Sequence, residues 1–186
     1  MNLLLALADK RAEMTETIVN ISLLIPLAVI IAYYDVRYRR IPNAFVLATF
    51  VAGVTVNAIF DGMGGVTASL GGCAMAFGLM FMLHVFGAMG AGDVKLFAAI
   101  GAVTGMHLVV PTFVVVILTG GLLAVVSMIR AGRVMTTMHR VLQIFVGMLP
   151  GWEMPRFAVP VDRKHTLPYG VAITMGSVIS VAIFRI

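Results

Sequence analysis

Two short segments of the sequence carry acidic residues whose type and setting suit peptide hydrolysis. Asp35 follows an almost unbroken apolar stretch and is followed by the tripeptide IPN at residues 41–43, and Asp93 stands in the segment GAGDVK at residues 90–95. Two carboxylates a few ångströms apart do not both ionise readily, so they share a proton and act as a base and an acid. Such a pair activates water for attack on a peptide carbonyl without a metal, serine or cysteine.

Each aspartate also has an ordinary structural explanation. Asp35 could be a solvated loop residue paired with Arg37 or Arg39, although capping of its own helix does not explain it, because a helix C-terminus disfavours negative charge. Asp93 opens an apolar run, and aspartate is a preferred N-cap. Taken singly, each residue leaves both interpretations open. Together they favour a functional pair, because carboxylates in or beside a membrane are costly and usually functional.

Other reactive side chains offer no competing site. The four histidines show no i, i+4 pairing, so the sequence predicts no metal site and no cofactor. They are His84, His107, His139 and His165. The single cysteine, Cys73, cannot form an intrachain disulfide, and we interpret it as a small apolar packing residue.

The aspartates must be positioned by membrane helices. Of the 186 residues, 61% are hydrophobic and 11% are charged, against about 45–50% and about 25% in soluble domains. The predicted fold is an all-α polytopic membrane helix bundle of about six transmembrane helices, forming one membrane domain over residues 1–186. The predicted spans are residues 18–34, 44–60, 66–86, 94–106, 108–129 and 168–184. Within the connection before the last span, residues 141–149 form either an interfacial helix or an irregular packed loop.

The distribution of positive charge predicts the orientation. With this set of spans, ten of the 13 basic residues fall on one side of the membrane and three on the other. Because positive charge marks cytoplasmic loops, the N-terminus lies outside and both Asp35 and Asp93 lie at the cytoplasmic face, whereas Asp61 lies opposite. The net charge of +5 thus reflects a bilayer partner in the cytoplasmic membrane rather than nucleic acid.

These segments resemble those of the type IV prepilin peptidases, a branch of the glycine-x-glycine-aspartate aspartyl proteases. The similarity rests on Asp35 with the IPN tripeptide, on GAGDVK, and on LPYG at residues 167–170. The resemblance implies that Asp35 and Asp93 are the catalytic pair. It also implies supporting roles for five residues around the active loop and the turn into the second span: Gly90, Gly92, Lys95, Pro42 and Asn43. Lys95 could instead be a membrane anchor.

The family resemblance also implies a substrate and a limit to the activity. The substrate would be a prepilin-type protein with a short basic leader and an apolar helix. Larger members of the family carry a cytoplasmic region with cysteine pairs and methylate the new N-terminus, and this chain has one cysteine. We therefore expect a membrane aspartic endopeptidase without N-methyltransferase activity. The short form looks most like the peptidases of tight-adherence pilus systems, and an archaeal pilin or archaellin peptidase is also compatible.

Two other functions remain open from the residues alone. A cation or proton transporter would use the two aspartates as ion sites, but several spans contain almost no polar residues at mid-depth to continue a path. A non-catalytic scaffold of a pilus or secretion assembly would not need the aspartates at all.

Overall fold

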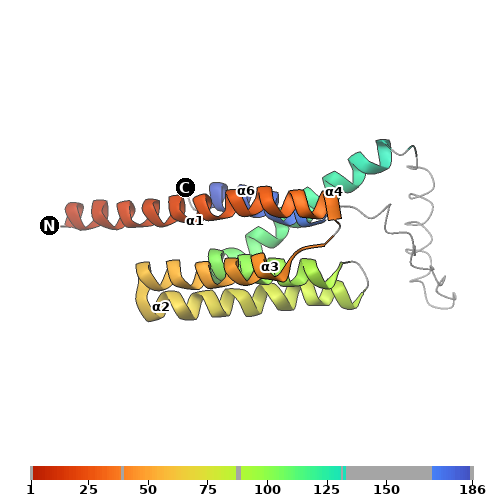
Figure 1. Cartoon of the computed structure of the whole chain (residues 1–186). Helices are drawn as coiled ribbons and strands as arrows, with labels where there is room; N and C mark the ends of the chain where they lie inside the picture. Colours follow the sequence, from red (N-terminus) through yellow and green to blue (C-terminus); the bar gives the residue numbers. More distant parts are fainter. Residues whose placement is uncertain (1, 39, 87–88, 131, 133–168, 185–186) are drawn as a thin grey trace, which may run out of the picture. The chain divides into compact units, whose positions relative to one another are not determined.

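The computed structural model describes residues 2–38, 40–86, 89–130, 132 and 169–184, and every regular element in them is a helix. In chain order these are α1 (Asn2–Tyr38), α2 (Asn43–Val85), α3 (Ala91–Thr104), α4 (Met106–Arg130) and α6 (Tyr169–Phe184) (Figure 1). The all-α prediction is therefore confirmed for this part of the chain. The segment 141–149, predicted as an interfacial helix or a packed loop, lies outside the described residues.

The chain divides into two compact units. One comprises Met1–Gly120 together with Pro168–Ile186, and the other comprises Gly121–Leu167. The first unit holds α1, α2, α3, α6 and the N-terminal part of α4, and it contains both aspartates. Of the second unit, the structure describes the C-terminal part of α4 and Gly132.

Helix α1 is longer than the span predicted at residues 18–34. It contains 37 residues and runs without interruption through the charged stretch at residues 9–13 and through Pro26. The charged stretch is rich in good helix formers, and proline is tolerated in membrane helices because neighbouring groups satisfy the freed carbonyl. The part of α1 that is apolar enough to cross a membrane is Met14–Tyr38. Asp35 therefore lies within the last turn of α1 instead of following it.

Helix α2 combines the second and third predicted spans and reverses direction between them. Gly62 adopts φ 57° and ψ −132°, which interrupts the helix in a region that glycine enters without steric cost. The two arms then lie side by side (Figure 1). Across them, the side-chain amide of Asn57 donates to Oγ of Ser69 at 2.7 Å. The predicted break between residues 60 and 66 is confirmed.

The number of crossings differs from the prediction. Among the described residues, three helices are long and apolar enough to cross a membrane: Met14–Tyr38, Asn43–Val85 and Met106–Arg130. Helix α6 is apolar but has 16 residues, and α3 has 14, below the approximately 17–25 that a crossing needs. Helix length therefore does not support the predicted count of about six spans. Both arms of α2 belong to one candidate helix, and α3 and α6 are too short. The break predicted near residue 105 is confirmed, since Gly105 separates α3 from α4.

Helix α3 is buried along most of its length, in direct contact with α2. A Cβ placed on Gly101 would lie 2.5 Å from the carbonyl oxygen of Gly72 and 2.6 Å from Cβ of Ala76, both in the second arm of α2. A Cβ on Gly53, in the first arm, would lie 2.8 Å from the backbone nitrogen of Val103. Small residues thus let α3 approach the backbone of both arms. The start of α3, which carries Asp93, is fixed by this packing.

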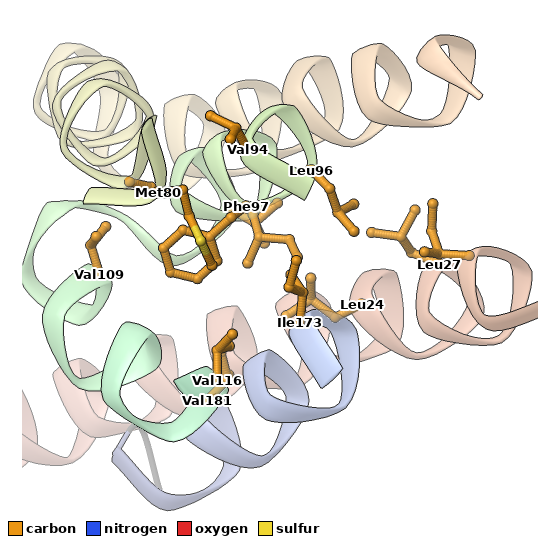
Figure 2. Packing of buried hydrophobic residues seen from close by; sticks show 14 residues of the cluster. Leu24, Leu27, Met80, Val94, Leu96, Phe97, Val109, Val116, Ile173 and Val181 are labelled. Atoms are coloured by element: carbon orange, nitrogen blue, oxygen red, sulfur yellow. The ribbon is translucent and has the colours of Figure 1, made fainter. Parts of the chain in front are cut away.

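Apolar side chains from five helices meet around Phe97 of α3 (Figure 2). Leu24 of α1, Met80 of α2, Val109 of α4 and Ile173 of α6 belong to this cluster, and none of the five side chains is more than 2% exposed. In a bilayer such contacts stabilise through van der Waals packing more than through exclusion of water. The shared core connects the helices that carry Asp35 and Asp93.

Candidate active site

Asp35 is buried and its carboxylate contacts a helix other than its own. The side chain is 8% exposed, and Oδ2 accepts a hydrogen bond of 2.8 Å from the backbone N–H of Gly170 in the first turn of α6. The first N–H groups of a helix have no partner within that helix, and they carry the positive end of its dipole. The dipole at the end of α1 disfavours the charge of Asp35, whereas the N–H group and the dipole at the start of α6 favour it. Its interpretation as a solvated loop residue is wrong.

Asp93 occupies the first turn of α3, and its side chain reaches back to the residue before the helix. Gly90 is the N-cap residue, and its N–H donates to Oδ2 of Asp93 at 3.2 Å. The explanation of Asp93 as a helix-capping residue is therefore partly right. Its side chain accepts a backbone N–H at the start of α3, but Asp93 is the third helical residue and not the N-cap. The side chain is half-buried, so part of the carboxyl group remains accessible.

The two carboxylates act on each other electrostatically. Burial raises the pKa of Asp93, the Gly90 hydrogen bond lowers it, and the charge of Asp35 raises it, from an ordinary value of 3.8 to about 6. A carboxyl group with this pKa is close to half-protonated in mildly acidic solution and gives up or takes a proton readily near neutral pH. Although they are 58 positions apart in sequence, Asp35 and Asp93 thus lie close enough for the charge of one to affect the other.

Tyr169 is a third polar group at this site that the sequence reasoning did not assign. It begins α6, is half-buried, and lies within electrostatic range of Asp93. Its ring lies beside Gly120 of α4, where an added Cβ would be 3.8 Å from Cε1 of the tyrosine. The signal in the sequence was the LPYG segment, which pointed to the start of the last helix but did not reveal which groups it faces.

Gly90 and Gly92 have ordinary backbone conformations. Gly90 has φ −78° and ψ 151°, and Gly92 lies in the first turn of α3. The left-handed glycines among the described residues are Gly62, Gly105 and Gly132. What Gly90 does provide is space, because a Cβ there would lie 3.1 Å from Oδ2 of Asp93.

The other three supporting residues lie at the edges of the site. Pro42 is the N-cap residue of α2, and its carbonyl accepts the N–H of Phe45 at 3.1 Å, so it ends the connection from α1. Asn43 and Lys95 are exposed and line a small groove between α2 and α3. Lys95 thus faces the groove, and its assignment as an anchor or as a partner of Asp93 stays a prediction.

His84 holds the segment that leads into the aspartate loop. Its Nδ1 lies 2.8 Å from the carbonyl oxygen of Met89, the residue before Gly90. This contact joins the end of α2 to the start of α3, and it accounts for a histidine that sequence spacing left without a role.

Two cavities accompany these helices. An open apolar groove of about 290 Å³ runs along α3 and is lined by eight residues: Asn43, Val46, Leu47, Phe50, Cys73, Lys95, Ala98 and Ala99. A larger cavity of about 800 Å³ has a mixed polar and apolar lining that includes Glu16, Asp61 and His107, and none of the aspartate-site residues borders it. In the part of the chain that the structure describes, no three His, Cys, Asp or Glu side chains are placed to hold a metal ion.

Comparison with known proteins gives one match. A model of the type IV leader peptidase family matches residues 22–125. This segment is more than half of the chain, and it includes Asp35 and Asp93 but not α6. No curated protein and no solved structure matches the sequence.

Proposed function

Because the chain belongs to the type IV leader peptidase family, we propose that it is a membrane aspartic endopeptidase that removes the leaders of prepilin-like proteins. The apolar helices make it a membrane protein. The observation that carries the proposal is the coupling of Asp35 and Asp93, which come from α1 and α3 and share one electrostatic environment. Two such carboxyl groups with one proton between them are the catalytic equipment of an aspartic protease.

The proposed reaction uses one carboxyl group as base and the other as acid. We assign Asp93 as the acid, because its pKa is raised to about 6 and a fraction of it therefore still holds a proton near neutral pH, and Asp35 is the base. The Asp35 carboxylate takes a proton from water, the water oxygen bonds to the scissile carbonyl carbon, and Asp93 protonates the carbonyl oxygen. The tetrahedral intermediate then collapses: the carbon–nitrogen bond breaks, the leaving amine receives the proton held by Asp35, and Asp93 takes back the proton of one hydroxyl group as the carbonyl of the new carboxyl terminus forms.

The groove along α3 is suited to the apolar segment of the substrate. Its walls are formed by side chains such as Val46, Phe50 and Ala98, with Lys95 and Asn43 supplying the polar groups. A groove of about 290 Å³ accommodates a few side chains of an apolar helix and not a whole one. In the proposed complex the leader lies at the membrane surface, and the apolar helix packs against α2 and α3.

The same proposal fixes an orientation and a number of crossings. With the N-terminus outside, both arms of α2 cross the bilayer, and α3 and α6 complete about six crossings with α1 and α4. The aspartate pair then lies at the cytoplasmic face, where the positive charge of the loops is concentrated. With one cysteine in the chain and no cysteine-pair region, we propose peptidase activity without N-methylation.

The experiment is cleavage of a prepilin by the purified protein in detergent. Asp35→Asn and Asp93→Asn each remove one ionisable carboxyl group and keep the shape, so the precursor should stay uncleaved, with rates reduced by about a thousandfold or more. Asp61→Asn is the matched control, because Asp61 is exposed in the turn of α2. This variant should cleave the prepilin at the normal rate. Normal cleavage by either active-site variant would reject the proposal.

A further inference from the structure

A single peptide unit lies between His84 and the Asp93 carboxylate. The carbonyl oxygen of Met89 lies 2.8 Å from Nδ1 of His84, and the N–H of Gly90 donates to Oδ2 of Asp93 at 3.2 Å. These two backbone groups belong to one peptide bond, which is trans. A trans peptide bond is planar, and its C=O and N–H groups point in opposite directions. One rigid unit, the Met89–Gly90 peptide bridge, therefore contacts the histidine on one side and the aspartate on the other.

The two hydrogen bonds of the peptide bridge run in the same direction. A carbonyl oxygen only accepts, so Nδ1 of His84 carries a proton and donates it. Hydrogen bonds in a chain polarise one another, so this donation makes the N–H of the same peptide a stronger donor. That N–H is the one that Asp93 accepts. Burial raises the pKa of Asp93, and the Gly90 hydrogen bond opposes the rise.

The surroundings of His84 suit a fixed support rather than a substrate contact. The residue lies in the last turn of α2, is half-buried, and has its ring centroid 6.2 Å from that of Phe81. It does not line the groove along α3. The carbonyl of Gly90 accepts the N–H groups of Asp93 and Val94 at 3.1 and 3.3 Å. The start of α3 thus uses both backbone groups of Gly90, and His84 adds a contact from the end of α2.

We propose that His84 is a positioning residue for the aspartate pair: by holding the carbonyl of Met89, it directs the N–H of Gly90 at Asp93. This role rests on the proposed peptidase function. His84 acts through the backbone and not on the substrate. When Asp93 gives its proton to the scissile carbonyl oxygen, the carboxylate that forms is stabilised by the N–H of the peptide bridge.

Two substitutions of His84 separate its donor from its bulk. His84→Leu keeps an apolar side chain and removes the donor, whereas His84→Asn keeps an N–H donor close to the position of Nδ1. We expect kcat for prepilin cleavage to fall roughly threefold to tenfold in His84→Leu, the effect of weakening one hydrogen bond. KM should hardly change, and His84→Asn should keep the wild-type kcat. His107→Leu is the matched control, because His107 is exposed at the start of α4 and should leave kcat unchanged.

Infrared titration of the Asp93 carboxyl band, assigned with Asp93→Asn, reads the same contact without turnover. The midpoint should lie roughly half a pH unit to one unit higher in His84→Leu, because the ionised form loses part of its donor. It should stay at the wild-type value in His84→Asn. Asp35 and Tyr169 are the other titratable groups that interact with Asp93 in the described part of the chain, and both are kept in these variants.

Magnetic resonance can observe the peptide bridge directly. Carbonyl-labelled methionine with amide-labelled glycine selects the Met–Gly pairs, which occur at residues 63–64, 89–90 and 175–176. Met89→Leu assigns the signal of the bridge, and the other two pairs are internal references. The Gly90 amide proton should move upfield in Asp93→Asn, where the acceptor is neutral, and in His84→Leu, where the donor is less polarised.

Three results would overturn the role of His84. They are a wild-type titration and kcat in His84→Leu, equal losses in His84→Leu and His84→Asn, and a Gly90 amide signal that does not respond to Asp93→Asn. The last of these needs no change at His84. A protein in which the Asp93 titration and the Gly90 signal respond as expected, but which cleaves no prepilin, would overturn the proposed function and keep the peptide bridge.

Discussion

Asp93→Asn should make the folded protein more stable at neutral pH while it abolishes cleavage. Folding raises the pKa of this carboxyl group from 3.8 to about 6, and each unit corresponds to about 1.36 kcal/mol. The ionised group therefore costs the folded state at most about 3 kcal/mol at neutral pH. The cost is absent below about pH 4, where both states hold the proton, grows up to about pH 6, and is constant above it. Asparagine removes the charge and keeps an oxygen that can accept the Gly90 N–H.

The assay is thermal unfolding of the purified protein in detergent at about pH 4 and about pH 7.5. With about 2–4 °C per kcal/mol for a chain of this size, the midpoint should rise by up to about 10 °C at the higher pH and change little at the lower. Asp61→Asn should shift neither, because Asp61 is exposed. A gain of equal size at both pH values, or a loss at the higher, would refute the reasoning, since neither follows from an ionised group placed in a desolvated site.

Three further predictions concern the coupling, the packing and the groove. Asp35→Asn should lower the pKa of Asp93, because the charge of Asp35 is one of the causes that raise it; an unchanged infrared titration of Asp93 would contradict the coupling. Gly101→Val should lower the free energy of unfolding by about 1–3 kcal/mol through overpacking, because its Cβ would lie 2.5 Å from the Gly72 carbonyl oxygen. Gly78→Val is the control: Gly78 has open space around it, so this variant should be as stable as the wild type. Cys73 should form a disulfide with a cysteine placed in the apolar segment of a prepilin bound to Asp93→Asn; failure at every position along that segment would exclude the groove as the substrate site.

The sequence was sufficient to predict that the fold is helical and where two of its helical breaks lie. The limits of the apolar stretches predicted the breaks at Gly62 and Gly105, because an apolar stretch much longer than about 25 residues is too long for one crossing. The charge of the loops predicts that Asp35 and Asp93 share one membrane face, and the charge of Asp35 is one of the causes that raise the pKa of Asp93. Both conclusions depend on local patterns, which is why a single sequence could supply them.

What the sequence could not supply depends on contacts between distant helices. The hydrogen bond from Gly170 to Asp35 joins residues 135 positions apart, and no spacing rule predicts it. The sequence also does not show that Gly90 has an ordinary conformation and that its lack of a side chain makes room for the Asp93 carboxylate. Helix ends also depend on packing, so α1 continues past its apolar limits.

The measurement that tests the central claim most directly is cross-linking of the two aspartate positions in native membranes. Asp35→Cys and Asp93→Cys are combined in a Cys73→Ala background, which leaves no other cysteine in the chain, and treated with a short bis-maleimide. The account predicts joined peptides from α1 and α3 in mass spectrometry, and none when Asp61→Cys replaces Asp35→Cys. Cross-linking of the Asp61 pair without the Asp35 pair would contradict a shared catalytic site.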